Sequence, residues 1–309
     1  MIITVTLTPA LDKTVILPDF RVNEVNRIQS LRLDPGGKGI NVSKGLRALG
    51  VDSLATGILG GDTGRYIEKS LHEAGVACDF VWTDRDTRTN LKVVDPVRHT
   101  NTDINEPGAP VSAEVLETVF RKVEAASGAG DIVVLAGKAP ADTPDTIFAD
   151  WTRRLKARGV RVYMDADAGL LIRGAEACPA LIKPNDMELS RLTGRNFSSV
   201  EEMADAAREL VDQGIGTVVV SLGGDGALFV TQEKAYRGYG LKVDVQSTVG
   251  AGDSMLAALA CAESRHMSFR DGCALAMAFS AAAVTTPGTQ PAAQEVVDAL
   301  LAQVRIVEM

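Results

Sequence analysis

The sequence predicts an α/β fold in which helices cover both faces of a mostly parallel sheet. The main observation is the regular alternation of helix-like and strand-like segments from residue 112 onward, because strands separated by helices usually pair in parallel. A second observation is the length: 309 residues, without a repeat or a clean boundary, predict one domain over 1–309. A third is a pair of antiparallel patches, near 12–33 and 88–106, which predict a small β-sheet lid on the main sheet.

The first third of the chain supplies the first strand and the lid. Residues 2–7 alternate β-branched and apolar side chains and end before Pro9, so they are expected to form the first strand. Short strands are expected at 14–20 and 26–33, helices at 39–50 and 63–75, and a hairpin over 88–104. The hairpin is expected because two polar-alternating runs are joined by the short segment "PVR".

The remaining elements follow the alternation. The predicted strands are 131–136, 160–166, 180–184 and 217–223, each preceded by one helix. Three apolar segments predict helices at 252–264, 268–285 and 290–303.

Amino-acid composition limits the classes of function that the chain can have. The formal net charge of −8 and the pI near 5.1 argue against a surface for nucleic acid or anionic membranes, but leave room for small phosphorylated ligands. The four cysteines show no C-x-x-C spacing and the three histidines no metal-ligand spacing, which predicts reduced thiols and a cytoplasmic location. The longest apolar run, 273–284, is too short to span a bilayer.

The segment "STVGAGDS" (247–254) carries the strongest chemical signal. Its glycines free the backbone, so that amides at a helix start can point at one anion. Asp253 would repel a bound phosphate, yet it suits a base that takes a proton from a hydroxyl attacking a phosphoryl group. Taken alone, the segment slightly favours a helix cap instead.

Two other glycine-rich segments could approach a ligand through their backbone. "SLGGDGALFV" (221–230) fits either a nucleotide loop or a tight hairpin turn, and by itself the turn is favoured. "DPGGKGINVSKGL" (34–46) places Lys38 and Asn41 at a helix start, which fits an anion or polyol site or a turn with a solvated lysine. The chain lacks the Walker A pattern and a G-x-G-x-x-G after its first strand, which weighs against a dinucleotide-dependent oxidoreductase.

Polar side chains also follow predicted strands. Asn185 and Glu188 in "IKPNDMEL" fit a capping box or, functionally, a position near a hydrated Mg²⁺. The guanidinium group of Arg88 in "TRTN" can donate two parallel hydrogen bonds to a phosphate, or Arg88 is an ordinary exposed charge. Asp12 ends a strand, where sugar hydroxyls bind in many α/β proteins.

The order of these segments resembles the ribokinase-like carbohydrate kinases, the phosphofructokinase B family. The segments are "TLTPALD", "GGKGINVSKGLRALG", "TRTN", "IKPNDMEL", "VSLGGDGAL" and "STVGAGDS", and the resemblance covers essentially the whole chain. It implies a three-layer α/β/α fold with a β lid and an ATP- and Mg²⁺-dependent kinase. A homodimer formed through the lid is a further expectation.

The resemblance also implies roles for individual residues. It places the base at Asp253 and an anion hole at the backbone of Gly250, Ala251 and Gly252. It places the contacts to ATP at Lys183, Asn185, Ser221, Gly223, Gly224, Asp225, Gly226, Thr248 and Gly252. Glu188 would hold the metal through water. The contacts to the substrate would be Asp12, Gly37, Lys38, Asn41, Arg88, Asn90, Arg27 and Lys138.

Within the family, "NEVNR", "TRTNLKVVD" and "TDINEPG" are similar to the bacterial 1-phosphofructokinase group. The expected reaction is therefore conversion of fructose 1-phosphate to fructose 1,6-bisphosphate. Phosphorylation of tagatose 6-phosphate or fructose 6-phosphate is the alternative, and a catalytically silent regulator is the alternative of another class. The chain departs from the family at "GKAP" (137–140), where Lys138 replaces a small hydroxyl residue, and at "DADAG" (165–169).

Overall fold

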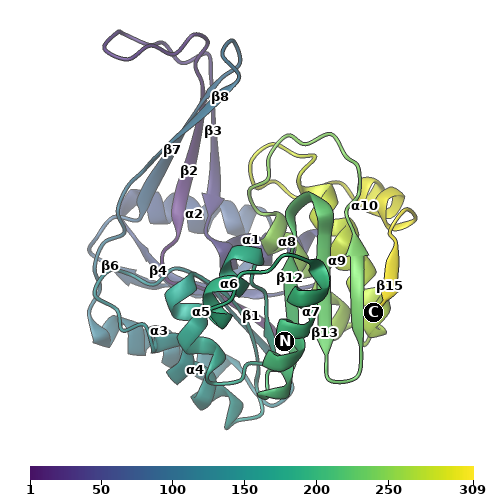
Figure 1. Cartoon of the computed structure of the whole chain (residues 1–309). Coiled ribbons are helices and arrows are strands. Elements are labelled where there is room, and N and C mark those ends of the chain that lie inside the picture. The colour runs from purple at the N-terminus through teal and green to yellow at the C-terminus, as the bar shows by residue number, and fades with distance from the viewer.

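The computed structural model describes the backbone of residues 1–309 and every side chain except that of Ala168. Its main body is a three-layer α/β/α arrangement around a sheet of eleven strands, and a small separate sheet projects from it (Figure 1). Among the described residues, no helix is both long and apolar enough to cross a bilayer.

The large sheet is parallel over most of its width. Its order is β15-β14-β13-β12-β11-β10-β9-β1-β4-β5, with β6 also paired to β4. The strands are β1 (Ile2–Thr6), β4 (Leu54–Gly60), β5 (Ala77–Cys78), β6 (Val81–Thr83), β9 (Ile132–Gly137), β10 (Arg161–Ala166), β11 (Leu181–Ile182), β12 (Thr217–Ser221), β13 (Gly226–Thr231), β14 (Ala235–Tyr239) and β15 (Ile306–Glu308).

Helices cover both faces, as predicted. One face packs against α3 (Ala113–Ala126), α4 (Ile147–Lys156), α5 (Ala168–Ala175), α6 (Asp186–Thr193) and α7 (Val200–Asp212). The other packs against α1 (Lys38–Ala48), α2 (Gly61–Glu73), α8 (Ala251–Ser264), α9 (Phe269–Ala283) and α10 (Gln294–Leu301). Fully buried aromatic side chains fill both interfaces, among them Phe120 and Phe148 on the first face and Phe279 on the second.

The structure differs from the sequence prediction in two places on the main sheet. The sequence predicted one helix between residues 184 and 217, but the structure has two. Gly194 ends α6 in a left-handed conformation, and Ser199 caps α7. The sheet also continues beyond β12 through three antiparallel strands. The turn between β12 and β13 is a tight one with a single 3-10 turn, Gly223–Asp225, as the hairpin interpretation expected.

The predicted antiparallel patches come together as a four-stranded sheet of order β3-β2-β7-β8. Its strands are β2 (Ala10–Ile16), β3 (Ser30–Gly36), β7 (Arg88–Asp95) and β8 (Thr100–Asn105). The strands predicted at 14–20 and 26–33 are therefore displaced toward residues 10 and 36, and residues 17–29 form a long connection.

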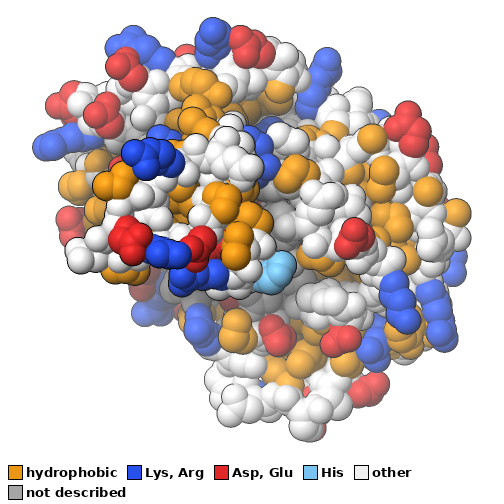
Figure 2. All heavy atoms as spheres, turned by 90° about the horizontal axis from the view of Figure 1, so that it is seen from above, with side chains coloured by type: hydrophobic (Ala, Val, Ile, Leu, Met, Phe, Trp, Pro, Cys, Tyr) orange, Lys and Arg blue, Asp and Glu red, His pale blue; other side chains and the backbone are white. Residues whose placement is uncertain are grey.

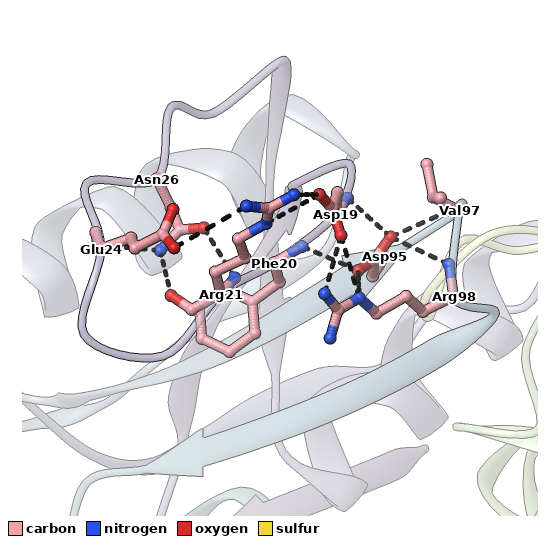
Figure 3. Close-up of polar contacts among 8 residues, drawn as sticks. All are labelled: Asp19, Phe20, Arg21, Glu24, Asn26, Asp95, Val97 and Arg98. Carbon is pink, nitrogen blue, oxygen red and sulfur yellow. Dashed lines mark hydrogen bonds and ion pairs between the residues drawn. The ribbon is translucent and has the colours of Figure 1, made fainter.

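A buried carboxylate explains why this connection is not a strand. Asp95, at the end of β7, accepts hydrogen bonds from the amides of Asp19 (3.0 Å) and Phe20 (2.8 Å). It also accepts from the amides of Val97 and Arg98 in the β7–β8 turn. Figure 3 shows how the carboxylate joins the two loops, with Arg98 and Arg21 flanking Asp19. Amides that bind Asp95 are not available to a β ladder.

Candidate active site

A cavity of about 410 Å³ lies where the parallel strands end and where α1 and α8 begin. Strand ends and helix starts meet at this edge in α/β folds, so polar side chains from distant segments converge there. Its lining residues are Thr6, Thr8, Asp12, Gly37, Lys38, Asn41, Arg88, Gly137, Lys138, Asp165, Asp167, Lys183, Asn185, Glu188, Ser221, Val249, Gly250, Gly252 and Asp253.

Asp253 lies at the bottom of this cavity, in the first turn of α8, with 6% of its surface exposed. Its Oδ2 accepts a hydrogen bond of 2.8 Å from Asn41 Nδ2. Gly250 is the N-cap residue of α8, and no side chain caps the helix, so the capping interpretation of Asp253 is wrong. Burial, and secondarily the nearby carboxylate of Asp165, raise the pKa of Asp253 to about 6. A carboxylate with such a pKa can accept a proton near neutral pH.

Asp165 is a site residue that the sequence analysis did not assign. It ends β10, is 1% exposed, and lies between two lysines. Lys38 Nζ donates to Asp165 Oδ1 at 2.7 Å, and Lys183 Nζ lies 2.9 Å from Oδ2. Burial opposes the charge on Asp165, but the two ammonium groups outweigh it and lower the pKa of Asp165. Burial likewise opposes the charge on Lys38, and Asp165 outweighs it and raises the pKa of Lys38.

The start of α8 presents backbone amides to the cavity. The first helical hydrogen bond runs from the Ser254 amide to the Gly250 carbonyl at 2.8 Å, so the preceding amides remain outside the helical ladder, and of Gly250, Ala251 and Gly252 only Ala251 has a backbone acceptor, the Thr248 carbonyl at 3.5 Å. Gly250 has φ 83°, a left-handed conformation that favours glycine. A Cβ on Gly252 would lie 2.9 Å from Lys183 Nζ, so the glycine lets an ammonium group approach this helix start.

Three buried polar atoms in this cavity and at its border with the small sheet have no partner within the described residues. They are Asn41 Oδ1, Arg88 Nε and Asn90 Oδ1. Asn90 Nδ2 donates to Asp12 Oδ1 at 2.9 Å, and burial raises the pKa of Asp12 although this hydrogen bond opposes the shift. Buried polar groups normally have partners, so these atoms indicate a place where a ligand with several polar groups completes the hydrogen bonds.

Lys138 extends from the end of β9 at the rim of this region. Its Nζ lies 3.4 Å from Asp167 Oδ2, and its side chain is 64% exposed. Asp167 is the N-cap residue of α5 but makes no capping hydrogen bond with its side chain.

The remaining predicted residues divide into three groups. Asn185 and Glu188 form the predicted capping box, with hydrogen bonds of 2.9 and 2.7 Å, and both line the cavity together with Ser221. Asn90 and Thr248 line a neighbouring cavity of about 640 Å³ beneath the small sheet. The four residues Gly223, Gly224, Asp225 and Gly226 form the turn after β12, and Ala251 is the first residue of α8; none of these five lines the cavity of 410 Å³.

Arg27 lies away from both cavities. The prediction placed it on a strand, but β3 begins only at Ser30, and Arg27 is an exposed residue of the connection that follows β2.

Comparisons with known proteins agree with this geometry. Residues 6–296 match the model of the pfkB family of carbohydrate kinases. The chain is 35% identical to a 1-phosphofructokinase of Bacillus subtilis over the full length of both proteins. It is 34% identical to a 1-phosphofructokinase of Haemophilus influenzae, covering 99% of this chain and 97% of the relative. A crystal structure of phosphofructokinase-2 from Escherichia coli, in complex with substrates and products, superimposes with a TM-score of 0.93 at 29% identity and 98% coverage of each chain.

Proposed function

Because the chain belongs to the pfkB family of carbohydrate kinases, we propose that it transfers the terminal phosphoryl group of ATP to fructose 1-phosphate. The product would be fructose 1,6-bisphosphate. The observation that carries the proposal is the buried carboxylate of Asp253, whose pKa is raised to about 6 beside a helix start where the amides of Gly250 and Gly252 have no backbone acceptor. That arrangement supports proton removal and phosphoryl transfer at one place.

In this proposal the sugar binds under the small sheet. Asn41 Oδ1 and Asn90 Oδ1 accept hydrogen bonds from sugar hydroxyls, which supplies the partners that both oxygens lack. The Arg88 guanidinium and the Lys138 ammonium bind the phosphate that the sugar already carries. Asp253 then takes the proton of the attacking hydroxyl.

The phosphoryl group is transferred at the start of α8. The sugar oxygen forms a bond to the γ-phosphorus while the bond from that phosphorus to the β,γ-bridging oxygen breaks, and ADP leaves. The amides of Gly250, Ala251 and Gly252 donate to the oxygens of the transferring group. Lys183, held by Asp165, lies beside Gly252 and stabilises the negative charge that develops there.

The donor set of the cavity fits a hydrated Mg²⁺. The cavity is lined by four cationic side chains (Lys38, Arg88, Lys138 and Lys183) and five carboxylates (Asp12, Asp165, Asp167, Glu188 and Asp253). These side chains alone do not neutralise a polyphosphate. Among the described residues no three His, Cys, Asp or Glu side chains form a metal-binding group. Mg²⁺ usually binds through few carboxylates, waters and substrate phosphates.

Glu188 is the residue that would hold the ion through water. One of its oxygens accepts from the Asn185 amide at 2.9 Å, which fixes the carboxylate and leaves the other oxygen for a water ligand. When bound, Mg²⁺ supplies positive charge to the β- and γ-phosphates of ATP.

A substrate panel tests the proposal. ADP release is measured with MgATP and, in turn, fructose 1-phosphate, fructose 6-phosphate, tagatose 6-phosphate and unphosphorylated fructose. We expect the highest kcat/KM with fructose 1-phosphate. A higher kcat/KM with either 6-phosphate would favour the alternative substrate. A higher kcat/KM with fructose would contradict the proposed binding site for the sugar phosphate.

We also propose that two copies associate through the small sheet. Large apolar side chains are exposed on it and on its connecting loops: Val22, Val25, Ile28, Leu31, Val97 and Ile104. Seen from above, hydrophobic and charged side chains are mixed over this end of the molecule (Figure 2). Light scattering measures the molar mass of the wild type and of the Leu31→Asp variant. We expect a dimer for the wild type and a monomer for the variant, because an aspartate buried at the interface should dissociate the dimer.

A further inference from the structure

A half-buried lysine connects the small sheet to the start of α8. Lys44 follows Asn41 by three residues on α1, so the two side chains lie on the same side of the helix. Its Nζ donates to the Pro35 carbonyl of β3 at 3.2 Å and to Thr289 Oγ1 at 2.9 Å. Burial lowers the pKa of Lys44, and the nearby carboxylates oppose that shift. Lys44 does not line the 410 Å³ cavity and has no part in the proposed reaction above.

Thr289 lies beside Gly250, the N-cap residue of α8. Its Cγ2 lies 3.5 Å from the position that a Cβ on Gly250 would occupy. Gly250 holds the left-handed conformation from which the free amides of α8 emerge. The position of Thr289 therefore bears directly on the position of those amides.

The neighbouring residue of the same loop also touches the small sheet. Gly288 has φ 68°, and a Cβ there would lie 2.4 Å from Arg32 Nη2 and 2.7 Å from Asp34 Oδ2. Arg32 and Asp34 belong to β3 and form an ion pair of 2.7 Å with each other. Two successive residues, Gly288 and Thr289, thus link β3 to the start of α8.

We propose that Lys44 is a positioning residue that fixes the amides at the start of α8 relative to the small sheet, acting through Thr289. The proposal rests on the proposed function, because that function gives the amides their role. The charged groups that face Lys44 are Asp12 on β2, Arg32 and Asp34 on β3, and Asp253 on α8. The ammonium charge also favours the ionised form of Asp253, since opposite charges stabilise each other.

Three variants test this by kinetics. Lys44→Met keeps the length of the side chain but removes its charge and donors, and Thr289→Val removes only the hydroxyl that accepts. We expect Lys44→Met to lower kcat about tenfold to a hundredfold, because small misplacements of catalytic groups have effects of that size, with little change in either KM. Lys44→Arg should restore most of kcat. The same substitution at the exposed Lys69 of α2, Lys69→Met, is the matched control and should leave kcat unchanged.

A double variant and a pH profile separate positioning from charge. If Lys44 acts through Thr289, Lys44→Met with Thr289→Val should be no slower than Lys44→Met alone, whereas multiplied effects would overturn the proposal. The acidic limb of kcat/KM should move to higher pH in Lys44→Met, because a nearby cation is lost, and should stay in place in Thr289→Val. A general loss of folding would not produce that difference.

Hydrogen exchange of the ligand-free protein supplies a readout that does not depend on activity. We expect faster exchange of the amides at 250–254 and 286–290 in Lys44→Met and Thr289→Val than in the wild type and Lys69→Met. Unchanged exchange in both variants would overturn the proposal. If the wild type phosphorylates no sugar of the panel, the proposed function fails and this experiment still decides the role of Lys44. If Lys44→Met does not fold, Thr289→Val decides alone.

Discussion

Replacing Asp253 by asparagine should remove catalysis and at the same time stabilise the fold. The variant keeps an oxygen that can accept the hydrogen bond of 2.8 Å from Asn41, but it cannot take a proton. A positioned general base usually contributes about 10²–10⁴-fold in rate, so kcat should fall at least that far while ATP still binds. In the wild type, the acidic limb of kcat/KM should fall near pH 6, where Asp253 titrates.

The stability effect follows from the direction of the pKa shift. The pKa of Asp253 is raised from 3.8 to about 6, so the folded protein binds this proton more tightly than the unfolded chain does. Folding stability therefore falls as the pH rises from about 4 to about 6, and above that window the loss stays constant. Since one pKa unit corresponds to about 1.4 kcal/mol, the loss at pH 8 is at most about 3 kcal/mol. Asp253→Asn should recover part of it.

Steady-state ADP release between pH 5 and 9, together with urea unfolding at pH 8 and pH 4, measures both effects. The stabilisation of Asp253→Asn over the wild type should be present at pH 8 and almost absent at pH 4. If Asp253→Asn kept a kcat close to that of the wild type, Asp253 would not be the base of the chemical step. Equal stability of the two proteins at pH 8 would refute the reasoning about its burial.

Four further predictions concern the anion-binding amides, the phosphate of the sugar (two variants) and the small sheet. Gly252→Val places a branched side chain against a lysine ammonium, so kcat per folded molecule should fall about 10²–10³-fold, whereas a purely structural glycine would lower only the folded fraction. Arg88→Ala should raise KM for fructose 1-phosphate about tenfold to a hundredfold with little effect on KM for ATP, because charged hydrogen bonds contribute about 1.5–3 kcal/mol. Lys138→Ser should raise that KM less, since its ammonium is already shared with an aspartate; a change within about twofold would place Lys138 outside the site. If the small sheet closes over the sugar, the amides of 10–36 and 88–105 should exchange more slowly once fructose 1-phosphate is added, and exchange that ignores every sugar would count against a lid.

The sequence predicted most of the cavity because local patterns locate strand ends and helix starts. Lys38, Asn41 and Asp253 each lie in the first turn of a helix, and helix starts meet the ends of parallel strands at one edge of the sheet. Asp12 also lines the cavity, but it lies within β2 and not, as the sequence had predicted, at the end of a strand. The helices and parallel strands of the main body were predicted for the same reason, since their hydrophobic periodicity is a local property.

Asp165 could not be predicted in this way because its role depends on tertiary structure. Its partners Lys38 and Lys183 lie 127 and 18 residues away in the chain, and "YMDAD" does not show locally that two lysines meet there. Its place at the end of a strand was the only available signal. The end of the strand predicted at 14–20 likewise depends on a distant residue, because Asp95 accepts hydrogen bonds from the amides of Asp19 and Phe20 in the loop that follows β2. The β12–β13 hairpin agrees with the turn interpretation of 221–230, but β14 and β15 were not predicted, and β15 pairs with a strand far earlier in the chain, which no local pattern shows.

Asp165 also explains how two lysines can lie beside a base without weakening it. Lys38 and Lys183 each lower the pKa of Asp253, because a nearby positive charge favours the carboxylate. Burial is the main cause that raises the pKa of Asp253, and the negative charge of Asp165 acts in the same direction, against the two lysines. Burial opposes the charge on Asp165, but the two ammonium groups outweigh it and keep the carboxylate ionised, so its negative charge continues to act on Asp253. The cavity can therefore place two cations where phosphates are expected while Asp253 keeps a pKa suited to accepting a proton near neutral pH.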